Sequence, residues 1–135
     1  MNLDVVTSIL EAAGVGRLGI DLFQDHMPDD VPVGCMVRLP VDSIAVSGYL
    51  PTYFRSGKVQ AIVRAPSYEV GKALAGKVFK VLTIDQRTEF KGEEGELLML
   101  IHHLRPTALP VSYARTPGNL TEWSVNFTGS YVMPL

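Results

Sequence analysis

The sequence has one cysteine, few charged residues and no long apolar run, and each scarcity excludes a class of protein. Cys35 has no second cysteine to pair with, which excludes an internal disulfide framework and favours a reducing compartment. No uninterrupted apolar stretch approaches the roughly 20 residues that span a bilayer. The first residues lack the basic segment that opens a secretory signal, so we expect a soluble intracellular protein.

Charged residues make up 19% of the 135 residues, below the usual value of about 25%, while hydrophobic residues make up 47%. These values exclude a disordered tail, a collagen-like fibre and a coiled coil. We expect a single domain over residues 1–135, because the chain is too short for two ordinary domains. A small domain has much surface to cover, and so few charges indicate that other molecules cover part of it.

The charges that are present are sorted along the chain. Residues 1–50 hold seven acids and two bases, residues 51–82 hold one acid and six bases, and residues 83–135 hold six acids and four bases. The net charges of the three segments are therefore −5, +5 and −2. Two interpretations are open: the charges interleave on one surface after folding, or they form two faces of opposite sign that suit head-to-tail contact between copies.

Two segments have the three- and four-residue apolar spacing of a helix. Residues 3–13 are the first, and Asn2 is the expected N-cap. Residues 68–82 are the second, with Ser67 as the expected cap and an apolar stripe that starts at Val70. The helices therefore lie in the first and the middle part of the chain.

The other regular segments have the alternation or the short apolar runs of strands. The last is the clearest, because apolar residues from Trp123 to Met133 alternate with polar ones. Two connections are expected to lack regular structure: a polar-aromatic one at 41–57 and a proline-containing one at 105–118. The expected strands are 22–24, 36–39, 58–65, 83–90, 96–104 and 122–133.

No pattern in the sequence points firmly to catalysis or metal binding. The pair His102-His103 comes closest to a metal site, but neighbouring residues of a strand point to opposite faces. Cys35 lies in an apolar strand without a neighbouring base, and the acid pairs at 29–30 and 93–94 lie in turns, where carboxylates are solvated. We therefore expect no enzyme, no cofactor and no metal. A small metal-dependent hydrolase that uses the two histidines and the turn acids is the alternative from another class.

Nucleic-acid binding has little support in the sequence. A net charge of −2 and a pI of about 5.9 argue against a general nucleic-acid binder, which usually carries a basic excess. Tyr53 and Phe54 beside Arg55 are a weak sign in the other direction. A nucleic-acid-binding module is therefore the third alternative.

Several stretches, taken in order, resemble the tail terminator proteins of long-tailed bacteriophages, which are also called minor capsid or tail completion proteins. After the first helix comes DLFQDHMPD at 21–29, and VQAIVRAPSYEVG at 59–71 leads into the second helix. Near the end stand RP at 105–106, PV at 110–111, PGN at 117–119 and EWSVNF at 122–127. The resemblance covers nearly the whole chain and keeps the order of its segments.

The resemblance implies a compact α+β single domain, with two main helices packed on a mixed or antiparallel β-sheet and with long loop or hairpin arms. It implies a structural protein of the virion tail and neck, assembled in the host bacterial cytoplasm. Such a protein forms a homohexameric ring that caps the head-proximal end of the tail tube, stops tube polymerisation and forms the interface for head attachment. Another head–tail connector or stopper protein is the close alternative.

The partners that the resemblance implies are further copies of the chain, the major tail tube protein and a head-side connector or stopper. It implies no cofactor, no membrane and no specific nucleic-acid recognition, although DNA is expected to pass through the lumen of the ring. A ring also needs two different patches of one subunit to meet on adjacent copies. We therefore expect acids from residues 1–50 of a neighbour to meet Arg55, Lys58 or the three lysines at 72, 77 and 80.

We expect the connection at 41–57 to be an arm that touches a neighbouring subunit or the tube, because it carries several aromatic and aliphatic residues. The alternative is a local hairpin that covers the domain's own core. The candidate interface residues are Ile44, Val46, Tyr49, Leu50, Tyr53, Phe54, Arg55, Lys58, Lys72, Lys77 and Lys80.

Overall fold

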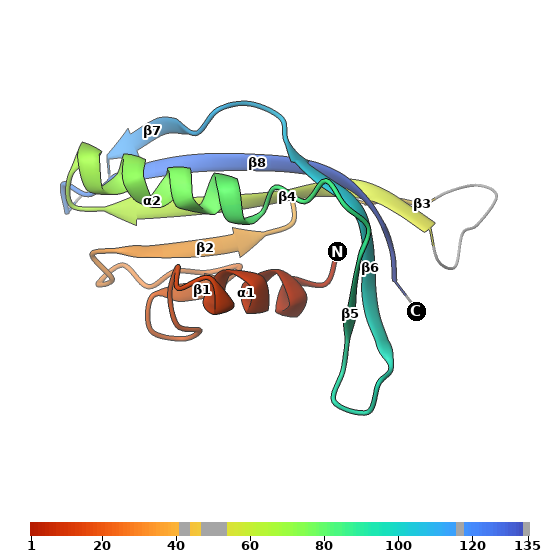
Figure 1. Ribbon diagram of the computed structural model, residues 1–135. Coiled ribbons are helices and arrows are strands. Elements are labelled where there is room, and N and C mark those ends of the chain that lie inside the picture. The colour runs from red at the N-terminus through yellow and green to blue at the C-terminus, as the bar shows by residue number, and fades with distance from the viewer. Residues whose placement is uncertain (41–43, 47–53, 116–117, 134–135) are drawn as a thin grey trace.

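The fold is organised around one curled β-sheet with two helices, seen in a computed structural model of the chain (Figure 1). The structure describes residues 1–40, 44–46, 54–115 and 118–133, with only the backbone at 44–46, 54–56 and 113–115. The elements in chain order are α1 (Leu3–Ala12), β1 (Leu22–Gln24), β2 (Gly34–Arg38), β3 (Ile44–Val46), β4 (Phe54–Ala65), α2 (Tyr68–Val81), β5 (Thr88–Lys91), β6 (Leu97–Pro106), β7 (Val111–Arg115) and β8 (Thr121–Val132).

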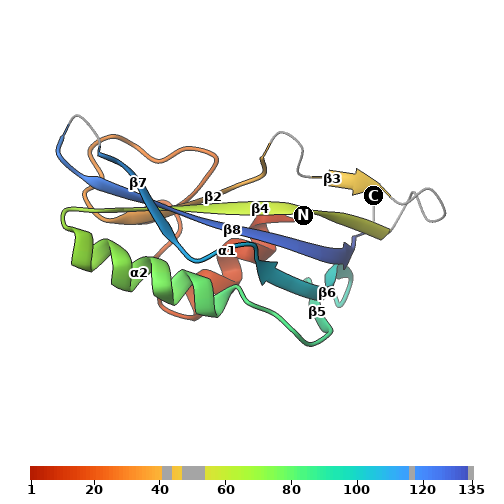
Figure 2. The ribbon, with the colours of Figure 1, turned by 90° about the horizontal axis from the view of Figure 1, so that it is seen from above.

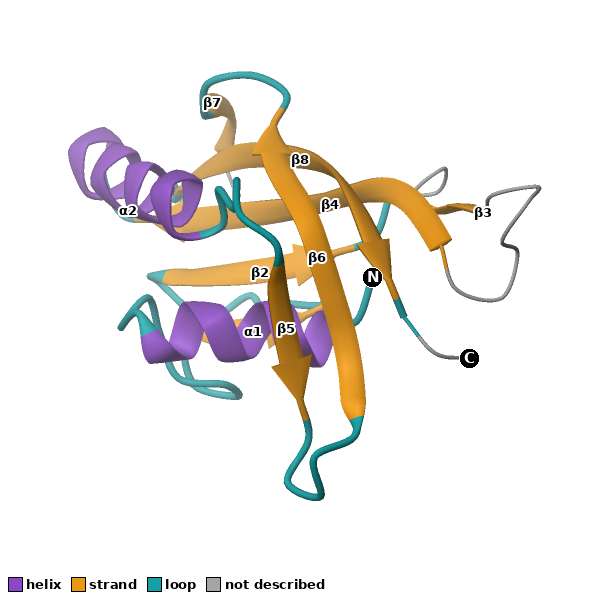
Figure 3. Cartoon of the chain, turned by 45° about the vertical axis from the view of Figure 1, so that its right-hand side comes forward, coloured by secondary structure: helices purple, strands orange, loops and turns teal. Residues whose placement is uncertain are grey.

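The centre of the sheet is the antiparallel pair of β4 and β8, which run alongside each other for 12 residues each (Figure 3). The strand order is β1-β2-β4-β8-β6-β5, while β3 pairs with β4 and β7 pairs with β8. The β1–β2 pair is parallel and the other pairs are antiparallel. The expectation of an α+β domain with two helices on a mixed sheet is therefore confirmed. In the described part of the chain, no helix is long and apolar enough to cross a membrane.

Helix α1 forms where the sequence predicts it and ends one residue earlier than expected. The Asn2 side chain accepts hydrogen bonds from the amides of Asp4 and Val5, at 3.0 and 3.4 Å. These bonds satisfy two of the amides that a helix N-terminus leaves without intrahelical partners. The helix buries Val6 and Leu10 completely, so its apolar side fixes α1 on the sheet.

Helix α2 also follows its prediction, since Ser67 caps it by accepting from the Val70 amide at 3.3 Å. Its buried side runs through Gly71, Ala75 and Val78 rather than through Val70, which is 45% exposed. The expected apolar stripe is therefore wrong at its first residue. The space beneath this turn is already filled by Trp123 of β8, which lies against Gly71 and leaves no room for a larger side chain.

Both helices cover the same face of the sheet, which we call the helical face (Figure 2). The alternation predicted for β4 and β8 is confirmed: Val59, Ala61, Val63 and Ala65 are buried in the core together with the odd-numbered residues of β8. Burial of this apolar surface is the main source of the stability of the fold. The even-numbered residues of both strands lie on the opposite face, which we call the outer face.

The loop at 25–33 covers one end of the outer face and builds a second, smaller apolar cluster. Met27 of the loop packs against Met36 of β2 and Ile62 of β4, and all three side chains are buried. This explains why two large apolar residues stand at positions that the alternation assigns to the outer face. The rest of that face is lined mainly by polar residues of β2, β4 and β8.

Three expectations for strands and connections differ from the structure. The strand expected at 83–90 is shorter, because β5 begins at Thr88 and Ile84 makes only an isolated bridge to Leu104. The connection expected at 105–118 contains a strand, β7. The connection at 41–57 likewise contains β3 and the first residues of β4. In each case the outcome depends on pairing with another strand: β3 pairs with β4, β7 pairs with β8, and Ile84 bridges to β6.

A β-bulge interrupts β6 at His102. The register passes from Ile101 opposite Tyr131 to His103 opposite Ser130, so His102 is an extra residue. The strict alternation that predicted opposite faces for the two histidines therefore does not hold at this point. Gly129 lies against the bulge, since a Cβ at this position would be 2.6 Å from the His103 carbonyl oxygen. The missing side chain of Gly129 makes room for the bulged strand.

Candidate assembly surfaces

The three lysines predicted to lie at an interface share the exposed side of α2. Lys72, Lys77 and Lys80 are all exposed and line a shallow hollow of about 660 Å³ together with Ala73 and Gly76. Lys77 Nζ donates a hydrogen bond to the Gly14 carbonyl at 3.2 Å, which ties this lysine to the loop after α1. Tyr68 and Glu69 also line the hollow, so its three lysines outnumber its one carboxylate and the surface is suited to a chain that carries negative charge.

A second surface lies on the outer face, where a row of polar side chains crosses the three central strands. Arg38 Nε donates to Gln60 Oε1 at 2.6 Å, and Gln60 Nε2 donates to Ser124 Oγ at 2.9 Å. Asn126 Nδ2 donates to the same Ser124 oxygen at 2.9 Å. These bonds hold the polar side chains in fixed positions, so the row is a preformed surface.

This row forms part of the lining of a hollow of about 690 Å³, which we call the basic basin. The basin is lined by Arg38, Leu39, Pro40, Lys58, Val59, Gln60, Thr107, Asn126 and Phe127. Lys58 and Arg105 both lie opposite Thr128 in the register, one on each side of β8, so Arg105 adds a further exposed cation to the same face. Lys58 therefore lies on the outer face, whereas the three lysines of α2 lie on the helical side.

The predicted arm is described only in part. Ile44 and Val46 lie in β3, which pairs with residues 55–57 of β4, so this backbone forms a local hairpin. Phe54 and Arg55 are the first residues of β4. Tyr49, Leu50 and Tyr53 lie outside the described residues. A contact of this arm with a neighbour or with the tube stays a prediction.

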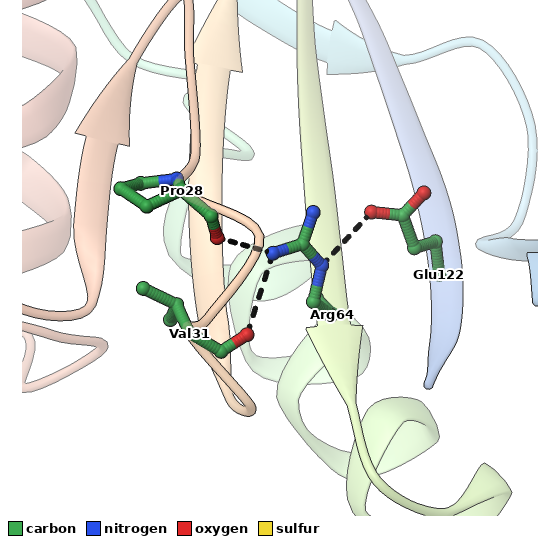
Figure 4. A network of polar contacts seen from close by, with 4 residues as sticks. All are labelled: Pro28, Val31, Arg64 and Glu122. Carbon is green, nitrogen blue, oxygen red and sulfur yellow. Dashed lines mark hydrogen bonds and ion pairs between the residues drawn. The ribbon is translucent and has the colours of Figure 1, made fainter. Parts of the chain in front are cut away.

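One basic residue of the 51–82 segment is buried inside the subunit (Figure 4). Arg64 is 7% exposed, and its Nε lies 3.1 Å from Glu122 Oε2. Its Nη1 donates to the carbonyl oxygens of Pro28 and Val31 at 2.7 and 3.3 Å. Arg64 therefore neutralises Glu122 and holds the 25–33 loop on the sheet, so its charge is not available at an interface.

The loop that Arg64 holds is strongly acidic, and we call residues 25–33 the acidic loop. Asp25, Asp29 and Asp30 are exposed. Within the described part of the chain, their carboxylates accept no hydrogen bond and form no ion pair. The backbone of the loop is fixed while its charges are unpaired, which is the arrangement expected of a charged contact surface.

The side chains considered for catalysis or metal binding lie in environments that do not favour either role. Cys35 is completely buried, and burial raises the pKa of its thiol to about 12, so the reactive thiolate does not form near neutral pH. Glu93 and Glu94 are exposed in the turn before β6. Among the described residues, no group of three or more histidine, cysteine or carboxylate side chains is arranged to hold a metal ion.

Exposed aliphatic side chains mark two further sites that the sequence did not single out. Leu18 and Ile20 are 53% and 63% exposed in the loop after α1, and Leu109 and Val111 are 76% and 54% exposed around the start of β7. The first loop is braced, because Asp21 Oδ1 accepts from the Arg17 amide at 2.6 Å. The sequence did not predict the exposure of these aliphatic pairs, because both lie in turn-rich segments without a helical or alternating pattern.

Comparison with known proteins gives the family. The model of the family described as "Bacteriophage tail terminator protein" matches residues 9–132, from within α1 to the end of β8. Among solved structures, a chain of "Virion of native gene transfer agent (GTA) particle" has the same fold, with a TM-score of 0.63, 14% identity, and coverage of 94% of this chain and 91% of that chain. Among curated proteins, none matches this sequence.

The family match confirms the resemblance noted in the sequence and extends over nearly all of the described elements. Tail terminator proteins are structural and not enzymatic, so the alternative of a metal-dependent hydrolase is excluded. The chain therefore belongs to the bacteriophage tail terminator protein family and is a structural component of the virion tail.

Proposed function

We propose that this chain forms a homohexameric ring on the head-proximal end of the tail tube, stops tube polymerisation there and presents the surface to which the head-side connector attaches. The observation that carries the proposal is the family match over residues 9–132. A protein in this role needs surfaces for its own copies, for the tube and for the connector. The surfaces described above are candidates for these contacts.

A closed ring requires two different patches of one subunit to meet on adjacent copies. The lysine surface of α2 and the basic basin lie on opposite sides of the subunit, and both are suited to acidic partners. The partners are further copies of the chain, the tube protein and the connector. The arm around β3, with Ile44 to Arg55, is a further candidate contact. We propose that DNA passes through the lumen without sequence recognition, because the net charge of −2 gives little general affinity for nucleic acid.

Electron microscopy of purified tails that carry a tagged copy of this protein tests the proposal. Gold or antibody label on the tag should appear at one end of each tail tube, the end at which the head attaches. Label on the portal side of isolated heads would instead favour a connector or stopper, and would contradict the proposed role. Tails from which the tag is absent give the background of the label.

Reversing the charge of the α2 surface should weaken assembly on tail tubes. The variant with Lys72→Glu, Lys77→Glu and Lys80→Glu should bind tubes at least about tenfold more weakly at low salt, because like charges then face the acidic partner. Binding is measured by co-sedimentation with tubes over a range of salt concentrations. Arg87→Glu with Lys91→Glu is the control, since these exposed residues pair with Glu89 of β5 and do not line the hollow on α2. Unchanged binding of the triple variant at low salt would contradict a contact through α2.

A further inference from the structure

The outer face carries charges of opposite sign at its two ends. At one end lies the part of the acidic loop with Asp29 and Asp30, which are exposed without partners among the described residues. Asp25 begins the loop at the other end, where its amide donates to the Val37 carbonyl at 3.0 Å. Arg64 anchors this loop through the carbonyls of Pro28 and Val31 (Figure 4). The acidic side chains are thus presented by a fixed backbone, and little conformational freedom remains to be lost on binding.

At the other end lies the basic basin. Arg38 of β2 and Arg105 of β6 stand on opposite sides of the β4–β8 pair, both exposed, and neither pairs with a carboxylate in the described part of the chain. The basin between them contains the hydrogen-bonded row of Gln60 and Asn126. This combination of cations and amide donors suits carboxylates and backbone groups of an incoming loop.

Asp29 and Asp30 cannot reach the basin of their own subunit. Residues 28–31 of the loop are bound at Arg64, whereas the basin lies around Gln60 and Lys58 of the same strand. Arg64 and Lys58 are six positions apart on an extended strand, so at about 3.3 Å per residue the two residues are about 20 Å apart. The loop is held in place by the Met27 cluster and by Arg64, so it does not swing across this distance.

We propose that Asp29 and Asp30 of the acidic loop of one subunit dock in the basic basin of the next copy of the chain. The proposal rests on the ring proposed above and assigns one of its subunit contacts. A patch at one end of the face that fits a different patch at the other end is a head-to-tail contact, and such contacts close into rings when the rotation between copies allows it. Charge complementarity selects a second copy as the occupant, because the chain itself carries both partners of the contact.

Two charge-reversed variants test this contact. The loop variant carries Asp29→Lys and Asp30→Lys, and the basin variant carries Arg38→Glu and Arg105→Glu. Each variant alone should associate at least about tenfold more weakly than the unmodified chain, because every contact then joins like charges. An equal mixture should regain assembly, since lysine loops meet acidic basins and unchanged loops meet unchanged basins in an alternating ring. Assembly is measured by native mass spectrometry and sedimentation velocity, alone and with tail tubes.

The control is Glu93→Lys with Glu94→Lys, an equal charge change in the exposed turn before β6, which should leave assembly as it is. Circular dichroism and the melting temperature establish that each variant is folded. Recovery in the mixture supports the contact, because a tube protein or DNA bound to the basin gives no reason for two defective variants to rescue each other. Failure of the mixture to assemble, or full assembly of each variant alone, would overturn it. An unmodified chain that stays monomeric even with tubes would overturn the proposed ring and the contact together.

Discussion

Replacement of Arg64 by methionine should lower the free energy of unfolding by about 3 kcal/mol, because it leaves the charge of Glu122 without its partner. Methionine keeps much of the apolar volume of the arginine stem and removes the guanidinium. The carbonyls of Pro28 and Val31 lose their donor at the same time. The Glu122 side chain is 18% exposed, so remaining contact with water keeps the cost at the lower end for a broken buried ion pair.

Urea unfolding measures this loss, with the fluorescence of Trp123, the single tryptophan, as the signal. A double-mutant cycle isolates the ion pair. The variant with both Arg64→Met and Glu122→Met should be less destabilised than the sum of the two single changes by about 1–2 kcal/mol, because no buried charge is then left alone. Simple additivity, or a loss below about 1 kcal/mol for Arg64→Met, would contradict the structural role assigned to this arginine.

Two glycine-to-alanine changes in the same helix should have opposite effects on stability. Gly76→Ala should raise the free energy of unfolding by roughly 0.5–1 kcal/mol, since alanine is the better helix former and a Cβ at this position meets nothing within 4 Å. Gly71→Ala should lower it by about 1–2 kcal/mol in spite of the same helix propensity gain. A Cβ at Gly71 would overlap the indole of Trp123, lying 2.7 Å from its Cδ1 and nearer still to Nε1.

The indole has little room to move away from such a Cβ. Trp123 is 4% exposed, and its ring lies against Tyr68 with 5.0 Å between the ring centroids. Unfolding in urea followed by circular dichroism compares the two variants without relying on the tryptophan signal. A gain in stability for both variants, or a loss for both, would show that the packing of α2 on β8 differs from the structure described above.

The sequence predicts the helices and the central strands because their signals are local. Asn2 and Ser67 cap helices within three residues, and the alternation of β8 repeats over its whole length. Strand β7 and the bulge at His102 were missed, because each depends on its register with β8. At Val70 the period of the helix was right, but Gly71 rather than Val70 faces the sheet, where it lies against Trp123, more than 50 residues away along the chain.

The candidate surfaces were predictable to a smaller extent. The lysines of α2 are exposed as expected from their positions away from the apolar stripe. Counting charges by segment could not reveal that Arg64 pairs with Glu122 and donates hydrogen bonds to two carbonyls inside the subunit. The count also could not predict that Arg38 and Arg105 lie on one face with Lys58, because both arginines come from segments of net negative charge. These placements follow from strand order, and strand order is a property of the whole sheet.

The low fraction of charged residues in the sequence corresponds to an uneven surface in the described part of the structure. Exposed aliphatic side chains stand on two loops, and charged side chains gather on the α2 surface, the acidic loop and the basic basin. The ring on the tail tube that we propose would cover surfaces of this kind. The family to which the chain belongs is one whose members work inside the virion, which agrees with this distribution.

The length of the tail tubes made in the absence of this protein tests the proposed role most directly. Electron micrographs of particles from infections that lack the protein should show tubes of variable and excessive length without heads, and supplying the protein should restore uniform tails with heads attached. The physical reason is that a tube end without its cap keeps offering the surface to which the next tube subunit binds. Uniform tubes of normal length with heads attached, made without this protein, would contradict the proposal that it ends tube growth.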